Sequence, residues 1–129
     1  MIDHLGINCS DLPAAGAFYD KVLGTLGYAR VLDFEVAIGY GKDKPDFWLG
    51  KQPDEGPASG PNREIHVAFQ AADAAAVRAF FDAAKEMGAE VLHEPKMWPE
   101  YHDSYYGAFV RDLDGNNVEA VCHTVQPGD

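Results

Sequence analysis

The chain has 129 residues, of which 47% are hydrophobic and 24% charged, and its formal net charge is −11. The length and balance predict a globular protein with one domain or two small halves. The acidic charge argues against nucleic acid or an anionic membrane as partner, because both are bound mainly through Lys and Arg. No apolar run approaches the roughly 20 residues of a membrane span, so we expect a cytoplasmic protein.

The first expected element is a strand that begins with His4. In "HLGINC" the apolar side chains alternate with His4 and its small or polar neighbours, so His4 lies on the face opposite the apolar set. A helix follows, with Ser10 or Asp11 as its N-cap and Gly27 at its end. Three shorter strands are predicted over residues 29–34, 35–41 and 46–51.

The same order of elements recurs after a segment that has no periodicity. Residues 51–62 are rich in Pro, Gly and polar side chains, which predicts a linker. Beyond it, "IHVAFQ" repeats the first strand with His66 in the place of His4, and Asp73 and Gly88 bound a second helix. Strands are predicted over 89–94, 106–112 and 117–123. The modules cover about 1–50 and about 63–124, and each reads as βαβββ in an α+β fold.

The last strand, "NVEAVCH", holds a carboxylate, Glu119, in an apolar pattern. Burying it is unfavourable unless a positive group meets it. Alternation places Glu119 on the same kind of face as His4 and His66. Two imidazoles and one carboxylate form a divalent-metal site with open positions, and Fe, Mn, Ni, Zn and Co all accept this set. The alternative partner for Glu119 is a basic side chain, and Arg111 is the nearest candidate on that face.

These residues carry a resemblance to a known family. "IDHLGINCSD", "EIHVAF" and "VRDLDGNNVEAV" resemble the vicinal oxygen chelate superfamily, which contains glyoxalase I, extradiol dioxygenases, fosfomycin-modifying transferases and bleomycin-binding proteins. The resemblance implies two βαβββ modules that form a U-shaped mixed sheet around a metal-binding cavity. Its metal ligands fall on His4, His66 and Glu119. It leaves the reaction open, because one fold of this kind supports many chemistries.

Departures from the family patterns bear on the reaction. Trp48 stands at the first-module position that matches Glu119, where glyoxalase I enzymes supply a carboxylate or amide, so we expect it to form an apolar wall. The dioxygenase pattern has a Tyr ten residues before its Glu and a Pro in the turn, whereas this chain has Phe109 and Leu113. The fosfomycin enzymes need a cluster of cations, and basic residues on the expected metal face are few.

An aromatic segment, "HEPKMWPEYHDSYY", covers residues 93–106 and is predicted to be a loop. One interpretation is a pocket wall or lid with an acid–base group, and the other is a packed loop or dimer contact. The catalytic candidates are His102, Tyr101 and Tyr106. The substrate-binding candidates are Trp48, Trp98, Tyr105, Phe109, Arg111 and His123.

Taken together, the sequence predicts a glyoxalase-like, divalent-metal-dependent lyase or isomerase that acts on a small oxygen-rich substrate. An extradiol-type ring-cleaving dioxygenase and a non-catalytic ligand-binding or antibiotic-binding protein are the alternatives. A homodimer is possible, since family members pair their modules within or between chains. Cys9 and Cys122 lie on the apolar faces of their strands, so we expect buried, reduced thiols that bind no metal.

Overall fold

The computed structural model describes residues 1–51 and 65–126. The chain divides into two compact units, Met1–Arg63 and Glu64–Asp129, and each unit is described by itself. The expected linker, 51–62, lies outside the described residues except for Lys51. Within the described ranges no helix has the length and apolar character needed to cross a membrane.

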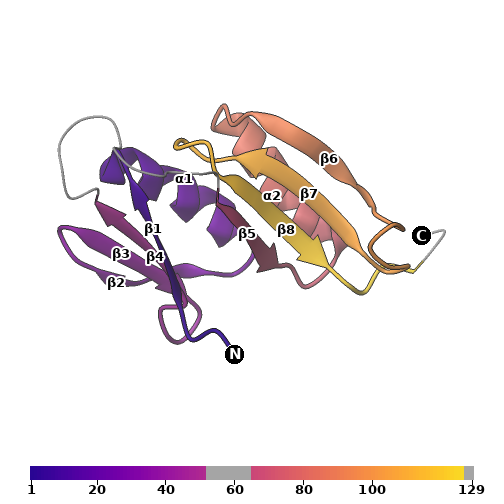
Figure 1. Cartoon of the computed structure of the whole chain (residues 1–129), viewed down its shortest axis with the longest axis horizontal. Coiled ribbons are helices and arrows are strands. Elements are labelled where there is room, and N and C mark those ends of the chain that lie inside the picture. Colours follow the sequence, from indigo (N-terminus) through magenta and orange to yellow (C-terminus); the bar gives the residue numbers. More distant parts are fainter. Residues whose placement is uncertain (52–64, 127–129) are drawn as a thin grey trace. The chain divides into compact units, whose positions relative to one another are not determined.

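Each unit has one helix and a four-stranded mixed sheet (Figure 1). The first unit consists of β1 (Leu5–Cys9), α1 (Leu12–Gly24), β2 (Ala29–Asp33), β3 (Ala37–Gly41) and β4 (Phe47–Lys51). The second consists of β5 (His66–Gln70), α2 (Ala74–Glu86), β6 (Val91–Met97), β7 (Tyr106–Arg111) and β8 (Asn117–Cys122). The strand orders, β1-β4-β3-β2 and β5-β8-β7-β6, are equivalent, and in each sheet only the first pair is parallel. The prediction of two βαβββ modules is confirmed.

The expected capping residues begin both helices. The side chain of Asp11 accepts a hydrogen bond from the Ala14 amide at 3.0 Å, and that of Asp73 accepts one from the Ala76 amide at 2.8 Å. Each bond satisfies an amide that has no partner inside its helix. After each helix a glycine takes a left-handed conformation, which other residues rarely adopt, and this turns the chain back toward its sheet.

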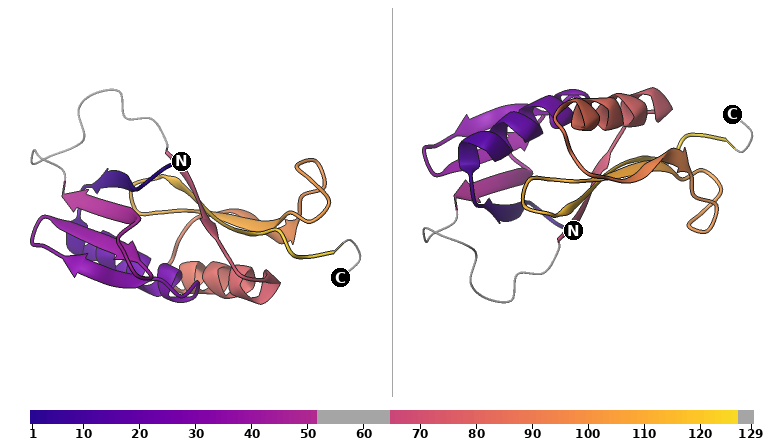
Figure 2. Two further views of the ribbon diagram at one scale, coloured as in Figure 1. Left: turned by 90° about the horizontal axis from the view of Figure 1, so that it is seen from below. Right: turned by 90° about the horizontal axis from the view of Figure 1, so that it is seen from above.

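Each helix covers one face of its own sheet (Figures 1 and 2). The covered faces form the cores. The first core holds Ile7, Phe18, Tyr19, Val22, Leu23, Tyr40 and Leu49, and the second holds Val77, Phe80, Ala84, Val110, Val118 and Cys122. The thiols of Cys9 and Cys122 are buried, as expected, and neither is part of a disulfide. The other face of each sheet is left uncovered by its helix, and His66 and Glu119 meet on that face of the second sheet.

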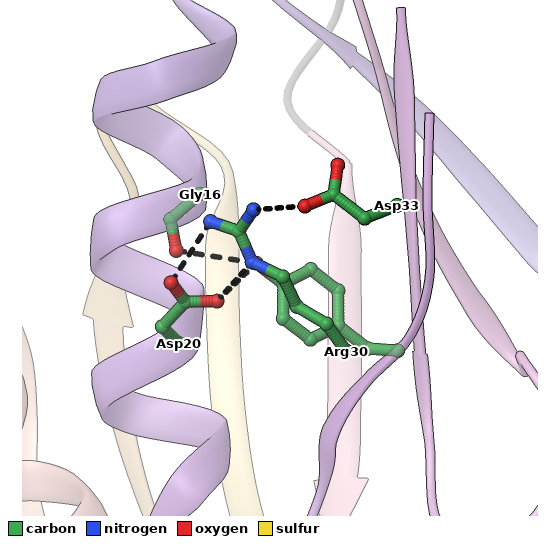
Figure 3. A network of polar contacts seen from close by, with 5 residues as sticks. Gly16, Asp20, Arg30 and Asp33 are labelled. Atoms are coloured by element: carbon green, nitrogen blue, oxygen red, sulfur yellow. Dashed lines mark hydrogen bonds and ion pairs between the residues drawn. The ribbon is translucent and has the colours of Figure 1, made fainter. Parts of the chain in front are cut away.

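A polar network joins α1 to the sheet of the first unit (Figure 3). Arg30 donates to both carboxylate oxygens of Asp20 at 2.7 and 2.9 Å and to Asp33 at 2.9 Å. The buried hydroxyl of Tyr40 donates to Asp20 at 2.9 Å and lies 3.1 Å from the carbonyl of Gly16. Burial, with the hydrogen bond to Asp20, raises the pKa of Tyr40. A side chain at Gly16 would crowd this network, because a Cβ there would lie 2.8 Å from the Arg30 guanidinium.

The strand registers show where the repeat places matching residues. Trp48 in β4 and Glu119 in β8 occupy equivalent central positions, as the sequence alignment predicted. The cross-strand rows are Gly6–Trp48–Gly39 in the first sheet and Ala68–Glu119–Phe109 in the second. One unit therefore has an indole between two glycines where the other has a carboxylate beside an aromatic ring.

Several strands begin or end one or two residues from their expected bounds, and β6 differs most. Strand β6 runs on to Met97, so residues 93–97 of the expected aromatic loop are strand, and the loop proper is 98–105. Pro95 lies inside β6. An edge strand can hold a proline because its outward amides need no partner, and the pairing of β6 with β7 is irregular between His93 and Lys96. The expectation of a loop over residues 93–97 is therefore wrong.

Candidate functional site

Glu119 and His66 form a pair on the uncovered face of the second sheet. Neighbouring strands place them together, because β5 and β8 run parallel and His66 lies opposite Asn117, two residues before Glu119. The His66 Nε2–H donates to Glu119 Oε1 at 3.0 Å. The carboxylate side chain is only 2% exposed, whereas the imidazole is 49% exposed. A buried carboxylate is thus joined to a ring that solvent or a ligand reaches.

The second carboxylate oxygen is held by a phenol. The hydroxyl of Tyr105, which directly precedes β7, donates to Glu119 Oε2. Burial of the phenol and this hydrogen bond raise the pKa of Tyr105, since ionisation would place two negative charges side by side. Among the described residues, Glu119 is paired with His66 and Tyr105 and with no Lys or Arg. This answers the question that its burial raised.

A cavity of about 510 Å³ opens beside this pair. Its lining consists of His66, Tyr101, Tyr105, Phe109, Asn117 and Glu119. The ring of Phe109 stacks on His66 with centroids 5.9 Å apart, so the imidazole has an aromatic wall on one side. Three other expected site residues therefore surround the pair: Tyr101 and Tyr105 from the loop, and Phe109 from β7.

The loop 98–105 is packed by its own rings and backbone. Trp98 is buried, and its indole N–H donates to the carbonyl of Gly107 at 3.0 Å. The Trp98 amide donates to the Tyr105 carbonyl at 2.8 Å, which closes the loop. Tyr101 stacks on Trp98 at 5.7 Å and meets the edge of Tyr105 at 4.9 Å. Trp98 thus anchors the loop, while Tyr101 and Tyr105 line the cavity.

His102 and His123 interact with each other at the outer side of the loop. The Ser104 amide donates to His102 Nδ1 at 3.1 Å, so the ring proton of His102 is on Nε2, which donates to His123 Nδ1 at 2.8 Å. Both rings lie edge-on to Tyr105, with centroids 5.4 and 5.3 Å away. These two histidines are exposed and do not line the cavity. They support Tyr105 from behind.

Two expected site residues lie elsewhere. Tyr106 is next to Tyr105 in the chain, and strand alternation turns it toward α2, where its hydroxyl lies 3.4 Å from the Arg78 guanidinium and borders a different cavity. Arg111 donates to Glu90 at 2.9 Å and to the carbonyl of Gly115 at 2.7 Å, so it fastens the turn before β8. Neither contacts Glu119.

His4 lies directly before β1 in the first unit. Its side chain is 59% exposed, and Nδ1–H donates to Asp3 at 2.7 Å, a bond that lowers the pKa of Asp3. The arrangement leaves Nε2 as the acceptor of the neutral ring, and histidines that bind metal commonly donate their other N–H to a carboxylate in this way. His4 and Trp48 border a groove of about 680 Å³ in this unit, and Trp48 stacks parallel to Phe34 at 6.2 Å.

The three expected metal ligands are not all found within one unit. In the parts of the chain that the structure describes, no three His, Cys, Asp or Glu side chains form a group with metal-binding geometry. The second unit brings two of the three expected ligands together, His66 and Glu119. The third, His4, belongs to the first unit.

Gly107 was missed by the sequence reasoning. A Cβ at this position would lie 3.2 Å from Glu119 Oε2 and 3.3 Å from the Tyr105 ring, so its absence makes room for their contact. A glycine in the middle of an apolar strand pattern is the signal that was available, because it marks a close approach by another group.

Comparisons with known proteins agree with this architecture. The sequence model of the Glyoxalase/Bleomycin resistance protein/Dioxygenase superfamily matches residues 1–120. A glyoxalase/bleomycin resistance protein from Albidiferax ferrireducens T118 is 26% identical over 93% of this chain and 97% of its own, with a TM-score of 0.80. A putative glyoxalase from Bacillus halodurans is 26% identical over 95% of each chain, with a TM-score of 0.73.

A further solved structure bears the name of an enzyme. Lactoylglutathione lyase from Agrobacterium tumefaciens is 26% identical over 95% of this chain and 92% of its own, with a TM-score of 0.67. A search of the curated proteins found no match.

Proposed function

Because the chain belongs to the Glyoxalase/Bleomycin resistance protein/Dioxygenase superfamily, we propose that it is a divalent-metal-dependent lyase or isomerase. Its substrate is a small oxygen-rich molecule. The observation that carries the proposal is the pair formed by His66 and the buried carboxylate of Glu119 beside a cavity. A carboxylate this deeply buried, next to a half-exposed imidazole and an open space, fits the ligands of an ion better than a surface ion pair.

The donor atoms suit such an ion. His66 Nε2 and Glu119 Oε1 lie 3.0 Å apart, so an ion that replaces the proton between them could be ligated by both atoms. The Nδ1 contact of His4 with Asp3 leaves the Nε2 lone pair of that ring for an ion. We propose that His4, His66 and Glu119 hold the metal. When bound, a divalent ion supplies electrophilic stabilisation of a developing enolate or alkoxide.

The chain's own residues shape the space around the pair. Phe109 forms an apolar wall and Tyr101 brings a hydroxyl to the cavity from the loop, so we assign Tyr101 the contact with the moving proton or with a substrate oxygen. The phenol of Tyr105 is already engaged with Glu119, and His102 lies outside the lining.

The lyase or isomerase reading is favoured over ring cleavage by two observations. The similarity to a lactoylglutathione lyase at 26% identity covers nearly the whole chain. Phe109 lies opposite Glu119 and has no hydroxyl to donate to a substrate oxygen, whereas the dioxygenase pattern has a Tyr there. The position of Trp48 separates this chain from glyoxalase I proper, so we propose a related reaction on a different substrate.

The test begins with metal content. Protein purified without added metal or a His tag is analysed by elemental mass spectrometry, beside His66→Ala, Glu119→Gln and, as a matched control, His123→Asn. We expect wild type and His123→Asn to hold an ion and the other two to lose it, since His123 is an exposed histidine of the same unit that packs against His102 and Tyr105 of the loop. Equal metal content in wild type and His66→Ala would exclude the site.

The second stage separates the reaction classes. Apo-protein is reconstituted with Zn²⁺, Ni²⁺, Co²⁺, Mn²⁺ or Fe²⁺ and tested on adducts of α-ketoaldehydes with thiols and on catechols. Turnover of an adduct supports the proposal. Turnover of catechols only with Fe²⁺ and oxygen would replace it with a dioxygenase, because ring cleavage needs a redox-active ion. Metal binding without turnover on either class would favour a binding protein.

A further inference from the structure

Glu119 has both of its carboxylate oxygens occupied, but by partners of different kinds. Oε1 meets His66, whose ring is half exposed, while Oε2 accepts from the phenol of Tyr105. The two oxygens are therefore not equivalent. Oε1 is on the side of the half-exposed imidazole, whereas Oε2 is covered by the phenol.

The fold makes the cover on Oε2 a fixed feature. Gly107 has no side chain at the point where a Cβ would lie 3.2 Å from Oε2 and 3.3 Å from the Tyr105 ring. Trp98 holds both residues in place. Its indole N–H donates to the Gly107 carbonyl, and its backbone amide donates to the Tyr105 carbonyl. The space at Gly107 and the two hydrogen bonds of Trp98 therefore fix the Tyr105 ring against Glu119.

The outer side of the loop adds a second brace. The rings of His102 and His123 lie edge-on to Tyr105, and the hydrogen bond between them ties the loop to the residue that follows β8. Glu119 is itself in β8. The Tyr105 phenol is therefore braced by a residue at the end of the same strand that carries the Glu119 carboxylate. The contact is thus supported from the inner and outer sides of the loop.

We propose that Tyr105 is a positioning residue that restricts Glu119 to a single ligating oxygen, Oε1, and thereby selects the metal. This rests on the proposed function, in which Glu119 and the two histidines hold a divalent ion. With Oε2 covered, the chain offers two imidazole nitrogens and one oxygen, a set that suits Ni²⁺, Co²⁺ or Zn²⁺. A carboxylate free to use both oxygens would add a second hard donor, which suits Mn²⁺.

The experiment compares metal preference in three proteins. Apo wild type, Tyr105→Phe and Tyr101→Phe are titrated with Ni²⁺ and with Mn²⁺ by calorimetry, and the ratio of the two dissociation constants is taken for each. Tyr101→Phe is the matched control, because it removes a phenol hydroxyl from the same loop without touching the Tyr105–Glu119 bond. Far-UV circular dichroism checks that each variant is folded.

We expect Tyr105→Phe to shift the ratio toward Mn²⁺ by about tenfold, the lower end of the effects on metal affinity when a partner of a ligating side chain is removed. Tyr101→Phe should leave the ratio unchanged. A general loosening of the loop would weaken both metals alike, so it would not move the ratio. An unchanged ratio in folded Tyr105→Phe would overturn the proposal.

Two outcomes distinguish this inference from the function on which it rests. If wild type binds neither ion, the metal-dependent function fails first, and the selective role of Tyr105 falls with it. If wild type binds Ni²⁺ through His66 and Glu119 but the ratio is the same without the phenol, only the inference fails. Should Tyr105→Phe not fold, Gly107→Ala, which crowds Oε2 and the Tyr105 ring, must shift the same ratio.

Discussion

The row Gly6–Trp48–Gly39 allows a matched pair of substitutions in the first unit. Both glycines flank Trp48 on neighbouring strands, and neither has a positive φ, so alanine strains the backbone at neither position. They differ in the space beside them. A Cβ at Gly39 would lie 2.8 Å from the Pro45 Cβ and 3.0 Å from two atoms of the indole, whereas one at Gly6 would lie 3.6 Å from the Trp48 Cβ.

These distances predict opposite effects of the two substitutions on the free energy of unfolding. Replacing a glycine by alanine where the backbone allows it stabilises a protein by about 0.4–1 kcal/mol, because the unfolded chain loses freedom. Gly6→Ala should show that gain, since 3.6 Å is an ordinary contact. Gly39→Ala also forces the indole or Pro45 to move, and such overpacking costs about 1–3 kcal/mol. We expect Gly39→Ala to destabilise by about 1–2 kcal/mol.

The free energy of unfolding is measured by urea titration followed by circular dichroism. In a Trp98→Phe background, the emission of Trp48 reports whether the indole has moved, and a shift is expected for Gly39→Ala alone. If both variants change the free energy of unfolding equally, or if Gly6→Ala is the more damaging one, the packing assigned to Trp48 is refuted.

Two further predictions concern the cores. Tyr40→Phe should lower the free energy of unfolding by about 1–2 kcal/mol near neutral pH, because it removes the donor to Asp20. Burial raises the pKa of Tyr40 above its unfolded value of about 10, so that contribution is fully present below pH ~10 and is lost as the pH rises through the higher pKa of the folded protein. Urea titrations of both proteins at rising pH should therefore converge, and a constant gap would contradict the assignment. Cys9 and Cys122 should react slowly with a thiol reagent in folded protein and rapidly in urea, and rapid labelling of either one in folded protein would show that it is not buried.

The fold could be predicted because its signals are local and repeated. Strand alternation, the caps Asp11 and Asp73 and the glycines after each helix depend on neighbouring residues, and each signal occurs twice at the same offset. The extent of β6 was less predictable. Whether a proline is tolerated depends on the strand's place at the edge of the sheet, which sequence pattern alone does not give.

The parts of the site that depend on strand alternation could be predicted, because alternation determines the face of the sheet on which a side chain lies. Alternation placed His66 and Glu119 on one face, and the register of β5 and β8 brings them within 3.0 Å. Alternation also separates Tyr105, which reaches Glu119, from Tyr106, which faces α2, although the sequence led us to expect that Tyr106 is catalytic and that Tyr105 binds substrate. The partner of Arg111 depends on Glu90, which is distant in the sequence, and no periodic pattern indicates it.

The two rows also explain how one repeat accommodates unequal roles. A carboxylate in a strand needs partners that shield its charge, and Glu119 has them in Tyr105 and His66, with Gly107 making the space. The equivalent position in the first unit has no atom that can ligate a metal, because Trp48 occupies it between two glycines. If an ion is bound as we propose, its carboxylate ligand at this repeat position is therefore Glu119 alone. Two histidines and one carboxylate would leave such an ion more open positions than a carboxylate from each repeat would, and two open positions are the condition for binding two substrate oxygens at once.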